Sequence, residues 1–331
     1  MFKKMYFCIS YSVNNKIFMA INITHIKNTV LTLSHCRLCP RHCGVDRTLG
    51  RTGYCKSGAK PLVSSVCIHH GEEPVISGEK GICNVFFAHC NLCCIYCQNY
   101  QISRNDSAIT EYEYDTKKLV QTIINVMKKA KTDMLGFVSP AHFSLQMVDV
   151  IKEIHHQGYT PTVVYNTNGY ETPDVLEYLA DYVDVYLPDF KYSDNILASR
   201  LSDVSDYVEK TFDALKIIYR QKGAKLEIDN HGIARNGIII RHLVLPEHIE
   251  NSKGVLRLIA KIDPDIHISL MSQYYPPRQL SIPELNRPLS NSEYETIIEE
   301  METLNMENGW IQELESFENY RPDFDNEHPF L

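Results

Sequence analysis

The eleven cysteines of this 331-residue chain all lie within its first 97 residues, and residues 98–331 contain none. Secreted disulfide scaffolds are usually short and distribute their bridges over the whole fold, so this odd-numbered, one-sided set favours metal or redox chemistry in a reducing compartment. The chain is long enough to bury a sizeable core without covalent staples. We therefore expect the cysteines to serve a site and not to hold the fold together.

Composition and charge exclude several broad classes of protein. Hydrophobic residues make up 44% of the chain and charged residues 22%, which is typical of a folded globular protein. The formal net charge of −8 does not favour binding to a nucleic-acid backbone. No stretch reaches the roughly 18 apolar residues that a membrane span needs, and the basic start at Lys3 and Lys4 lacks a signal-peptide cleavage site. We expect a cytoplasmic protein, with Met19 as an alternative start.

From residue 84 onward, short β-rich runs alternate with segments of helical periodicity, a pattern typical of a parallel sheet covered by helices. The predicted strands span residues 84–89, 134–138, 162–165, 183–187, 237–242 and 266–271. The predicted helices span residues 116–129, 145–157, 173–179, 206–221, 252–262 and 290–306. Ser144 and Asn251 suit helix N-caps, Gly158 suits the residue after a helix, and residues 225–236 suit a hairpin insertion.

Six such units form either a partial α/β barrel or an open doubly wound sheet, and periodicity does not separate the two. In both folds ligands bind at the carboxyl ends of the strands, so the residues that follow each strand are candidates for a site. We expect three parts in the chain: a cysteine-rich segment at residues 1–83, the α/β core at residues 84–306 and a C-terminal tail at residues 307–331.

The loop after the first predicted strand holds Cys90, Cys94 and Cys97 with the spacing C-x3-C-x2-C. Iron-sulfur clusters take thiolate ligands, and a four-iron cluster held by only three of them has one iron free for another ligand. A zinc knuckle or a set of unligated buried cysteines is the plainer alternative, although structural zinc prefers four protein ligands. A rival ligand set uses Cys93 in place of Cys94, which gives the spacing C-x2-C-x3-C.

With Tyr96 directly before its last cysteine, this loop resembles the signature of the radical S-adenosylmethionine (radical SAM) superfamily. The resemblance implies a 4Fe-4S cluster on Cys90, Cys94 and Cys97 whose open iron binds S-adenosylmethionine (SAM). In that family an electron, from a donor such as flavodoxin or ferredoxin, cleaves SAM to methionine and a 5′-deoxyadenosyl radical, which abstracts hydrogen from a substrate. The resemblance also implies a partial (β/α)6 barrel of the TIM-like type.

Within this superfamily the chain is similar to the pyruvate formate-lyase activating enzymes, and in particular to their uncharacterised iron-sulfur relatives. The similarity rests on residues 36–45, 71–74, 98–100, 165–170, 186–192, 241–246 and 271–274. It implies cofactor contacts from Tyr96, Gln98, Asn166, Thr167, Asp189 and Lys191. It further implies that the substrate is a glycyl residue of a partner enzyme.

The chain departs from those enzymes at two positions of the expected site. Residues 139–142 (Ser-Pro-Ala-His) stand where the activating enzymes carry Gly-Gly-Glu, so the carboxylate that contacts the methionine amino group is missing. Two groups could take the place of this carboxylate, namely His142 and a backbone carbonyl. Asn166 stands where they carry Asp, which removes a charge from the site of a monovalent cation. For Asp189 and Lys191, a surface ion pair is the plain alternative.

Arg241 and His242 end the fifth predicted strand, so one of them faces the cavity and the other the helices. Arg241 suits either a bidentate contact to a substrate carboxylate or an internal salt bridge. Gln273 and Tyr274 follow the sixth predicted strand, where they contact adenosine or substrate or else pack at the barrel rim.

A second group, Cys36, Cys39, Cys43 and Cys55, has the spacing C-x2-C-x3-C-x11-C. Four thiols suit a closed metal site, either a second iron-sulfur cluster or structural zinc, and unligated reduced thiols are the alternative. Activating enzymes with extra clusters usually carry them after the radical loop, so this N-terminal position departs from their pattern. Three further cysteines are expected to be structural: Cys8, Cys67 and Cys83.

The sequence therefore predicts a radical SAM oxidoreductase that activates a glycyl radical enzyme or acts on a small molecule or another peptide. A non-catalytic iron-sulfur or zinc-binding scaffold or sensor is the alternative from a different class. A nucleic-acid-modifying enzyme is disfavoured by the acidic balance and by the lack of a basic appended module. No catalytic side chain is assigned from the sequence.

Overall fold

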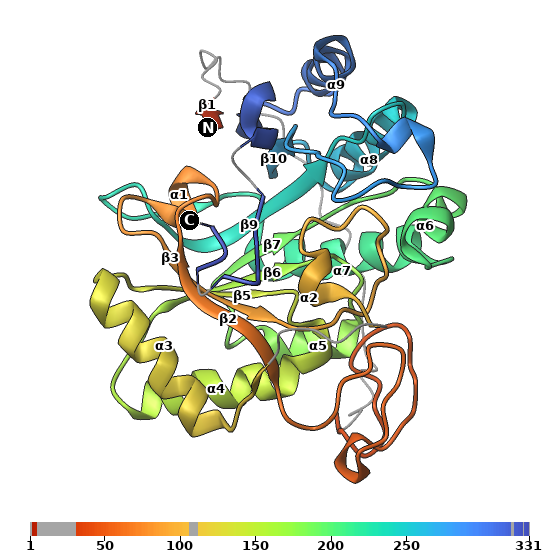
Figure 1. The fold of residues 1–331 in the computed structure, drawn as a ribbon. Helices are drawn as coiled ribbons and strands as arrows, with labels where there is room; N and C mark the ends of the chain where they lie inside the picture. Colours follow the sequence, from red (N-terminus) through yellow and green to blue (C-terminus); the bar gives the residue numbers. More distant parts are fainter. Residues whose placement is uncertain (1, 5–30, 106–111, 319–320, 327, 331) are drawn as a thin grey trace, which may run out of the picture.

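The computed structural model describes residues 2–4, 31–105, 112–318, 321–326 and 328–330. The N-terminal apolar stretch with Cys8 and the alternative start Met19 lies outside these described residues. Figure 1 shows the strands at the centre of the molecule and the longer helices around its outside. Within the described part of the chain, no helix has the length and apolar character needed to cross a membrane.

Parallel strands form the centre of the sheet. They are β3 (Ile82–Phe87), β5 (Met134–Val138), β6 (Thr162–Thr167), β7 (Val185–Pro188), β9 (Ala234–Leu243), β10 (His267–Met271) and β11 (Gly309–Gln312). Antiparallel strands β2 (Leu62–His69) and β4 (Tyr112–Glu113) extend the edge beside β3, and β1 (Phe2–Lys4) pairs antiparallel with β11 at the other edge. All six predicted strands are present, each within a few residues of its expected bounds.

The central strands follow one another across the sheet in chain order, from β3 to β11. A doubly wound sheet reverses its order at a switch point, and the described strands show no reversal. Right-handed crossovers that all step in the same direction place their helices on one face of the sheet. The helices therefore form an outer layer around a concave interior, and the fold is the partial α/β barrel that the sequence predicts (Figure 1).

The outer layer contains the helices α3 (Thr116–Ala130), α4 (Ser144–His156), α5 (Pro173–Leu179), α6 (Asn195–Ser202), α7 (Tyr207–Lys222), α8 (Ile249–Ile262) and α9 (Asn291–Thr303). Helix α3 shows why these segments fold as they do. The Asp115 side chain caps it by accepting the backbone N–H of Lys118 at 2.8 Å. Leu119, Ile123 and Met127 recur at helical spacing and are buried toward β2 and β3. The single-turn helix α1 (Pro74–Ser77) follows β2, and the single-turn helix α2 (Tyr100–Ser103) follows β3 and its loop.

Both predicted N-caps are wrong, whereas the predicted helix end at Gly158 is confirmed. Ser144 is already the first residue of α4, and α8 begins before Asn251. The Asn251 side chain instead holds the segment after β7, since it accepts the backbone N–H of Ser193 and donates to the carbonyl of Lys191, both at 2.9 Å. Gly158 follows α4 with a φ of +85°, which a residue without Cβ adopts freely.

Sheet pairing crosses the boundaries expected at residues 83 and 307. Strand β2 precedes residue 83 and pairs with β3, and β11 follows residue 306 and pairs with β10. The predicted hairpin at residues 225–236 is present, because β8 (Glu227–Ile228) pairs with β9 and Asp229 accepts the backbone N–H groups of His231 and Ile233. The division of the chain into three parts stays a prediction.

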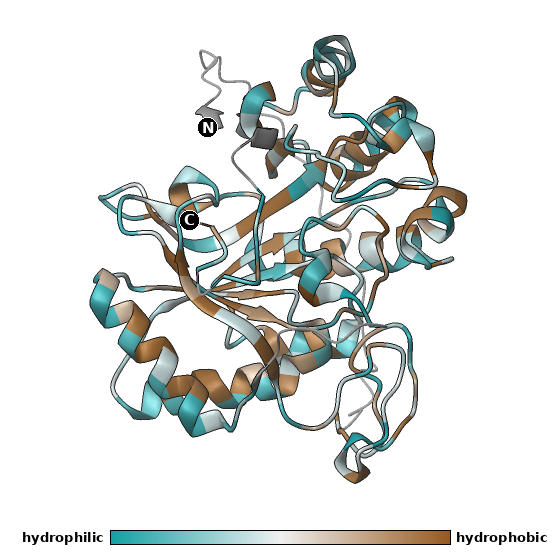
Figure 2. Ribbon diagram, viewed as in Figure 1, coloured by the Kyte–Doolittle hydropathy of each residue, from teal (hydrophilic) through white to brown (hydrophobic). Residues whose placement is uncertain are grey.

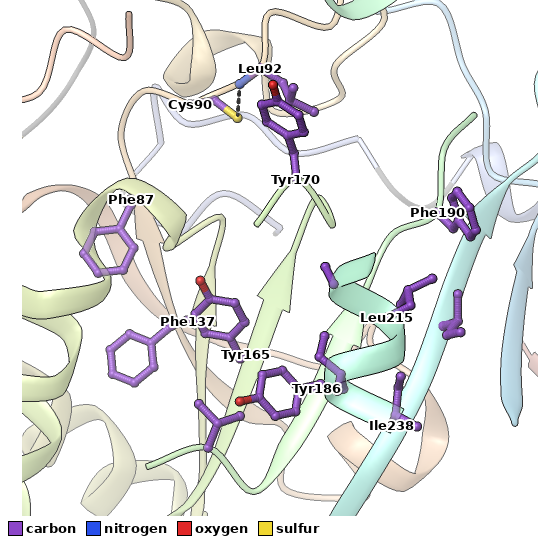
Figure 3. Close-up of a cluster of buried hydrophobic side chains, with 14 of the residues drawn as sticks. Phe87, Cys90, Leu92, Phe137, Tyr165, Tyr170, Tyr186, Phe190, Leu215 and Ile238 are labelled. Atoms are coloured by element: carbon purple, nitrogen blue, oxygen red, sulfur yellow. Dashed lines mark hydrogen bonds between the residues drawn. The ribbon is translucent and has the colours of Figure 1, made fainter. Parts of the chain in front are cut away.

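The larger apolar core lies between the sheet and the outer helices. Phe137, Tyr165 and Tyr186 on neighbouring strands, together with Leu215 of α7 and Ile238 of β9, are fully or almost fully buried there (Figure 3). Figure 2 shows the corresponding hydrophobic colouring along the strands and on the helices. This layer fixes the strand positions from outside and leaves the interior for a site.

Alternation of side chains divides the interior into a closed floor and a polar mouth. Val164, Leu187 and Ile239, on β6, β7 and β9, belong to an apolar cluster that fills the floor. Two residues further along the chain, side chains point to the same face, which brings Asn166 and Arg241 to the mouth. The site is therefore expected at the carboxyl ends of the strands.

Gly136 in β5 offers a direct test of this packing. A Cβ at this position would lie 1.9 Å from Oδ1 of Asn84, whose side chain donates to Glu72 at 2.7 Å. We predict that Gly136→Ala lowers the free energy of unfolding by about 1–3 kcal/mol, measured by urea denaturation. The control is Gly58→Ala, because no heavy atom lies within 4 Å of its added Cβ, and it should change stability by less than about 0.5 kcal/mol. Equal stability of the two variants would contradict the packing described.

Candidate functional site

A cavity of about 210 Å³ opens at the carboxyl ends of the strands. We call it the main cavity. Its walls come from segments far apart in the sequence: the loop after β2, the cysteine loop after β3, the segments after β6 and β7, and the end of β9. Residues 322 and 330, near the end of the chain, also contribute to the wall. This is the position that the barrel rule gives for a ligand.

Cys90, Cys94 and Cys97 all line the main cavity. Each sulfur accepts a hydrogen bond from a neutral donor: Asn168 Nδ2 on Cys90 at 3.4 Å, Ser202 Oγ on Cys94 at 2.9 Å and Ser103 Oγ on Cys97 at 3.2 Å. Figure 3 also shows the backbone N–H of Leu92 pointing at the Cys90 sulfur. Acceptor sulfurs facing one cavity fit a set of thiolate ligands with an open side.

Burial sets the charge state of these thiols. Burial raises the pKa of Cys90 to about 12 and that of Cys94 to about 11, so neither is charged at neutral pH without a cationic partner. Among the described residues, no three His, Cys, Asp or Glu side chains are grouped closely enough to hold one metal ion. A cubane distributes three thiolates over three iron atoms, so it does not require them to share one ion.

Cys93 is exposed and does not line the main cavity, although it lies between two residues of the loop that do. Its backbone N–H donates to the carbonyl of Ser202 at 3.2 Å, which holds the loop against the end of α6. The geometry therefore supports Cys94 over Cys93 as the middle ligand. The sequence alone left this choice open.

Asp189 and Lys191 form an ion pair at the wall of the main cavity, with Lys191 Nζ 2.5 Å from Asp189 Oδ2. Burial alone would lower the pKa of Lys191, but the Asp189 carboxylate outweighs it and the pKa is raised. The Tyr207 hydroxyl ties the pair to the neighbouring segment, because it lies 2.8 Å from the carbonyl of Asn168 and 3.0 Å from that of Asp189. The side chains are only about one fifth exposed, so they are not a surface ion pair.

Three of the other expected cofactor contacts reach the main cavity and one does not. Tyr96, Gln98 and Asn166 line it, with Gln98 held by a donated hydrogen bond to the carbonyl of Gln273 at 2.9 Å. Thr167 points to the opposite side of β6, where its hydroxyl donates to Glu171. Alternation along the strand is the reason, since Asn166 and Thr167 cannot both face the interior.

Residues 139–142 do not supply a carboxylate in place of Gly-Gly-Glu. Ser139 lines the main cavity with a φ of +53°. His142 turns away, with its Nε2 2.9 Å from the carbonyl of Ala88, and burial lowers its pKa to about 3. His142 is therefore not among the residues that line the main cavity, whereas Ser139 is.

Two acidic residues of the main cavity were not assigned a role from sequence. Glu72 and Glu73, in the loop after β2, both bond the Arg241 guanidinium, and Glu73 does so through two bonds, of 2.8 and 2.5 Å. The Arg241 side chain is 9% exposed and that of Glu73 is fully buried. Of the two roles considered for Arg241, the structure shows the internal salt bridge. The only sequence signal for this contact with Arg241 is the pair of acidic residues directly before Pro74.

The remaining residues at the strand ends are mainly structural. His242 faces the helices, where its ring nitrogens lie 2.7 Å from the Phe190 carbonyl and 2.8 Å from the Ser252 hydroxyl. Tyr274 is buried, and its hydroxyl donates to the carbonyl of Leu285 at 2.6 Å. Gln273, by contrast, lines the main cavity beside Gln98.

The second cysteine group is also gathered by the fold. Cys36, Cys39, Cys43 and Cys55 line a separate cavity of about 10 Å³, which we call the second cavity. Asn91, next to the ligand candidate Cys90, lies at the wall of this second cavity. Cys67 and Cys83 are buried away from both groups, in β2 and β3.

The chain is similar to several known proteins. A family model described as the radical SAM superfamily matches residues 84–228. An uncharacterized protein of Methanocaldococcus jannaschii is 29% identical over 281 residues, which cover 82% of this chain and 76% of that protein. The solved structure of Streptococcus suis SuiB bound to S-adenosylmethionine has 11% identity and a TM-score of 0.43, over 64% of this chain and 44% of that one.

A solved domain of a pyruvate-formate lyase-activating enzyme from Bacteroides vulgatus has 13% identity and a TM-score of 0.35, over 52% of this chain and 92% of that one. The matched residues 84–228 contain the cysteine loop, Asn166 and the Asp189–Lys191 pair.

The two candidates for the middle ligand give the first test of the site. We predict that Cys94→Ser lowers the iron content of the anaerobically reconstituted protein by about four iron per chain, with a matching loss of visible absorption, because Cys94 faces the main cavity. Cys93→Ser should keep both, because Cys93 faces solvent. Loss of the cluster only in Cys93→Ser would overturn the assignment.

Glu171 gives a test of the segment after β6. Burial raises its pKa to about 7, although Thr167 and Tyr165 donate hydrogen bonds to Oε1. A carboxyl with a raised folded-state pKa contributes its stability fully below its unfolded pKa, and this contribution is lost as the pH rises through about 7. We predict that Glu171→Gln is more stable than the parent at pH 8, by up to roughly 3 kcal/mol, and equally stable near pH 4.5.

Urea denaturation across this pH range measures the effect. Glu307→Gln, on an exposed side chain, is the control and should follow the parent protein at every pH. A Glu171→Gln curve parallel to that of the parent would show that the Glu171 carboxyl has the same pKa in the folded and the unfolded protein.

Proposed function

We propose that Cys90, Cys94 and Cys97 hold a 4Fe-4S cluster and that the main cavity binds SAM beside it, because residues 84–228 match the family model of the radical SAM superfamily. The protein then takes an electron from a flavodoxin or ferredoxin and cleaves the S–C5′ bond of SAM. Methionine and a 5′-deoxyadenosyl radical result, and the radical takes a hydrogen atom from the substrate. The observation that carries this proposal is the convergence of three acceptor sulfurs and a cavity-facing ion pair on one cavity.

The chemistry of the three sulfurs fits the cluster. When bound, a 4Fe-4S cluster supplies the electron for SAM cleavage and an open iron for the amino and carboxylate groups of methionine. The hydroxyls of Ser103 and Ser202 and the amide of Asn168 donate to the sulfurs, and such bonds adjust the reduction potential of a cluster. They also fix the cysteine side chains in the orientation that a ligand needs.

The chain's polar residues suit the two ends of SAM. Lys191 and Asn166 can hold the methionine carboxylate, and Asp189 keeps Lys191 charged and oriented. Tyr96 and Gln98 line the main cavity beside the cysteine loop. Pro322 and Phe330 also line the main cavity, and such apolar wall residues limit the access of water to a reactive radical.

We propose a glycyl residue of a partner enzyme as the substrate. The sequence resemblance to pyruvate formate-lyase activating enzymes supports this choice. The charges of the main cavity support it as well, since Arg241 is already paired with Glu72 and Glu73 and Lys191 is assigned to the methionine carboxylate. A neutral peptide segment requires no further cation, whereas an anionic small molecule would have to compete with Glu72 and Glu73 for Arg241.

The test is an anaerobic assay for 5′-deoxyadenosine with the reconstituted, reduced protein. We expect product from the parent protein, none from Cys94→Ser, and about 10- to 100-fold less from Lys191→Ala, as the loss of a charge-assisted hydrogen bond implies. Lys117→Ala, on the exposed face of α3, is the matched control and should retain full activity. Absence of product from a protein with a complete cluster would favour the non-catalytic scaffold or sensor.

The substrate class needs a separate readout. Incubation with a glycyl radical enzyme should produce the doublet of a glycyl radical in electron paramagnetic resonance, in an amount that depends on SAM. If deuterium from a deuterated small molecule enters 5′-deoxyadenosine and no protein radical appears, the small-molecule alternative is favoured instead.

A further inference from the structure

The loop at residues 31–61 is folded around the four cysteines of the second cavity. Backbone hydrogen bonds close it, from Cys36 N to the Val45 carbonyl and from Gly44 N to the Cys36 carbonyl, both at 2.9 Å. Gly53 lies directly against the Cys43 sulfur, because a Cβ at this position would be 2.7 Å from it. The backbone of this loop therefore lies close to the sulfurs, as is typical of the backbone around thiolate ligands in metal sites.

Arg47, beside these thiols, is a buried cation that lacks a carboxylate partner. It is 1% exposed, and its guanidinium donates to the carbonyls of Gly58 at 2.8 Å and His142 at 2.6 Å. Its Nη1 lies 3.9 Å from the sulfur of Cys36. Among the described residues no acidic side chain bonds it, and its Nη2 has no hydrogen-bond partner at all.

A buried charge without a counter-charge is strongly unfavourable. Neutral thiols at Cys36, Cys39, Cys43 and Cys55 would leave Arg47 in this state. Four thiolates around zinc, or around an iron-sulfur cluster, carry a net charge of roughly −2, which would neutralise it. His142 adds a second unpartnered group at the same wall, since its Nδ1 is buried without a hydrogen bond.

We propose that Cys36, Cys39, Cys43 and Cys55 hold a second metal centre through four thiolates, with Arg47 as its counter-charge. The shared chemistry is tetrathiolate ligation, by a zinc ion or by an iron-sulfur cluster. In the described chain the four sulfurs are not grouped tightly enough for one ion, so they draw together on binding zinc or stay apart on binding a cluster.

The four-cysteine loop also contacts the cysteine loop after β3, so a metal in it would stabilise the position of that loop. Arg41, between two of the cysteines, donates through Nε to the carbonyl of Asn91 at 3.0 Å and through Nη2 to the carbonyl of Asp203 at 2.6 Å. Its guanidinium lies 3.7 Å from the centre of the Tyr54 ring, next to Cys55. Fixing the four-cysteine loop therefore fixes the backbone directly beside Cys90.

The first experiment separates this centre from the proposed catalytic cluster. In the full-length chain, Cys90, Cys94 and Cys97 are all replaced by Ala, and metal and sulfide are measured after isolation and after anaerobic reconstitution with iron and sulfide. We expect about one zinc, or about four iron with matching sulfide, per chain. Adding Cys39→Ser should remove this metal, whereas adding Cys67→Ser, on a buried cysteine outside the group, should not. A metal-free triple variant, or metal that survives Cys39→Ser, would overturn the proposal.

The second experiment uses the unaltered protein, so it does not depend on whether a variant folds. Cys43 and Cys93 are both exposed in the described chain. If Cys43 binds metal, native-state alkylation followed by mass spectrometry should label Cys93 at least ten-fold faster, and a strong chelator should abolish the difference. Equal labelling before the chelator is added would contradict a metal at Cys43. Neither readout depends on SAM cleavage, so this proposal and the proposed function fail independently.

Discussion

Parallel pairing of the strands in chain order is the constraint on which the rest of the structure depends. Each crossover steps one strand further in the same direction, so the helices collect on the outer face and the inner face is left concave. All carboxyl ends then lie at one rim. Three segments meet at this rim: the cysteine loop after β3, Asn166 in β6 and the ion pair after β7. Cys90 and Lys191 both line the main cavity although they are 101 positions apart in the sequence.

Three largely buried cations, Arg241, Lys191 and Arg47, differ in how their charge is balanced. Arg241 is held by two glutamates from the loop after β2, and Lys191 by Asp189 two positions earlier. In these pairs the counter-charge is built into the chain. No carboxylate of the described residues bonds Arg47, and the Cys36 sulfur lies 3.9 Å from its Nη1. This difference marks the four-cysteine loop as a place where a bound group completes the electrostatics.

The cysteine loop after β3 is positioned by remote segments rather than by its own sequence. Ser202 at the end of α6 reaches the Cys94 sulfur, and Asn168 after β6 reaches that of Cys90. Arg41 holds the opposite side of the loop through Asn91. A loop fixed from three directions keeps its thiols in place before a ligand arrives, which reduces the conformational cost of binding.

The sequence by itself determined the alternation of strands and helices, the C-x3-C-x2-C loop and the rim at which a site would lie. These features follow from local periodicity and spacing, and all six strands occur where they were predicted. Local spacing could not choose between a barrel and a doubly wound sheet, because that difference lies in strand order. It also could not show that Thr167 turns outward, that Glu72 and Glu73 neutralise Arg241, or that Ser202 bonds Cys94.

Only the tertiary structure decided these points, because they depend on which distant residues the sheet brings within hydrogen-bond distance. The same holds for Asn251, which suits an N-cap in the sequence but holds the segment after β7 in the fold. A motif can state which atoms are available for ligation. The pairing of the strands decides which of them face one another.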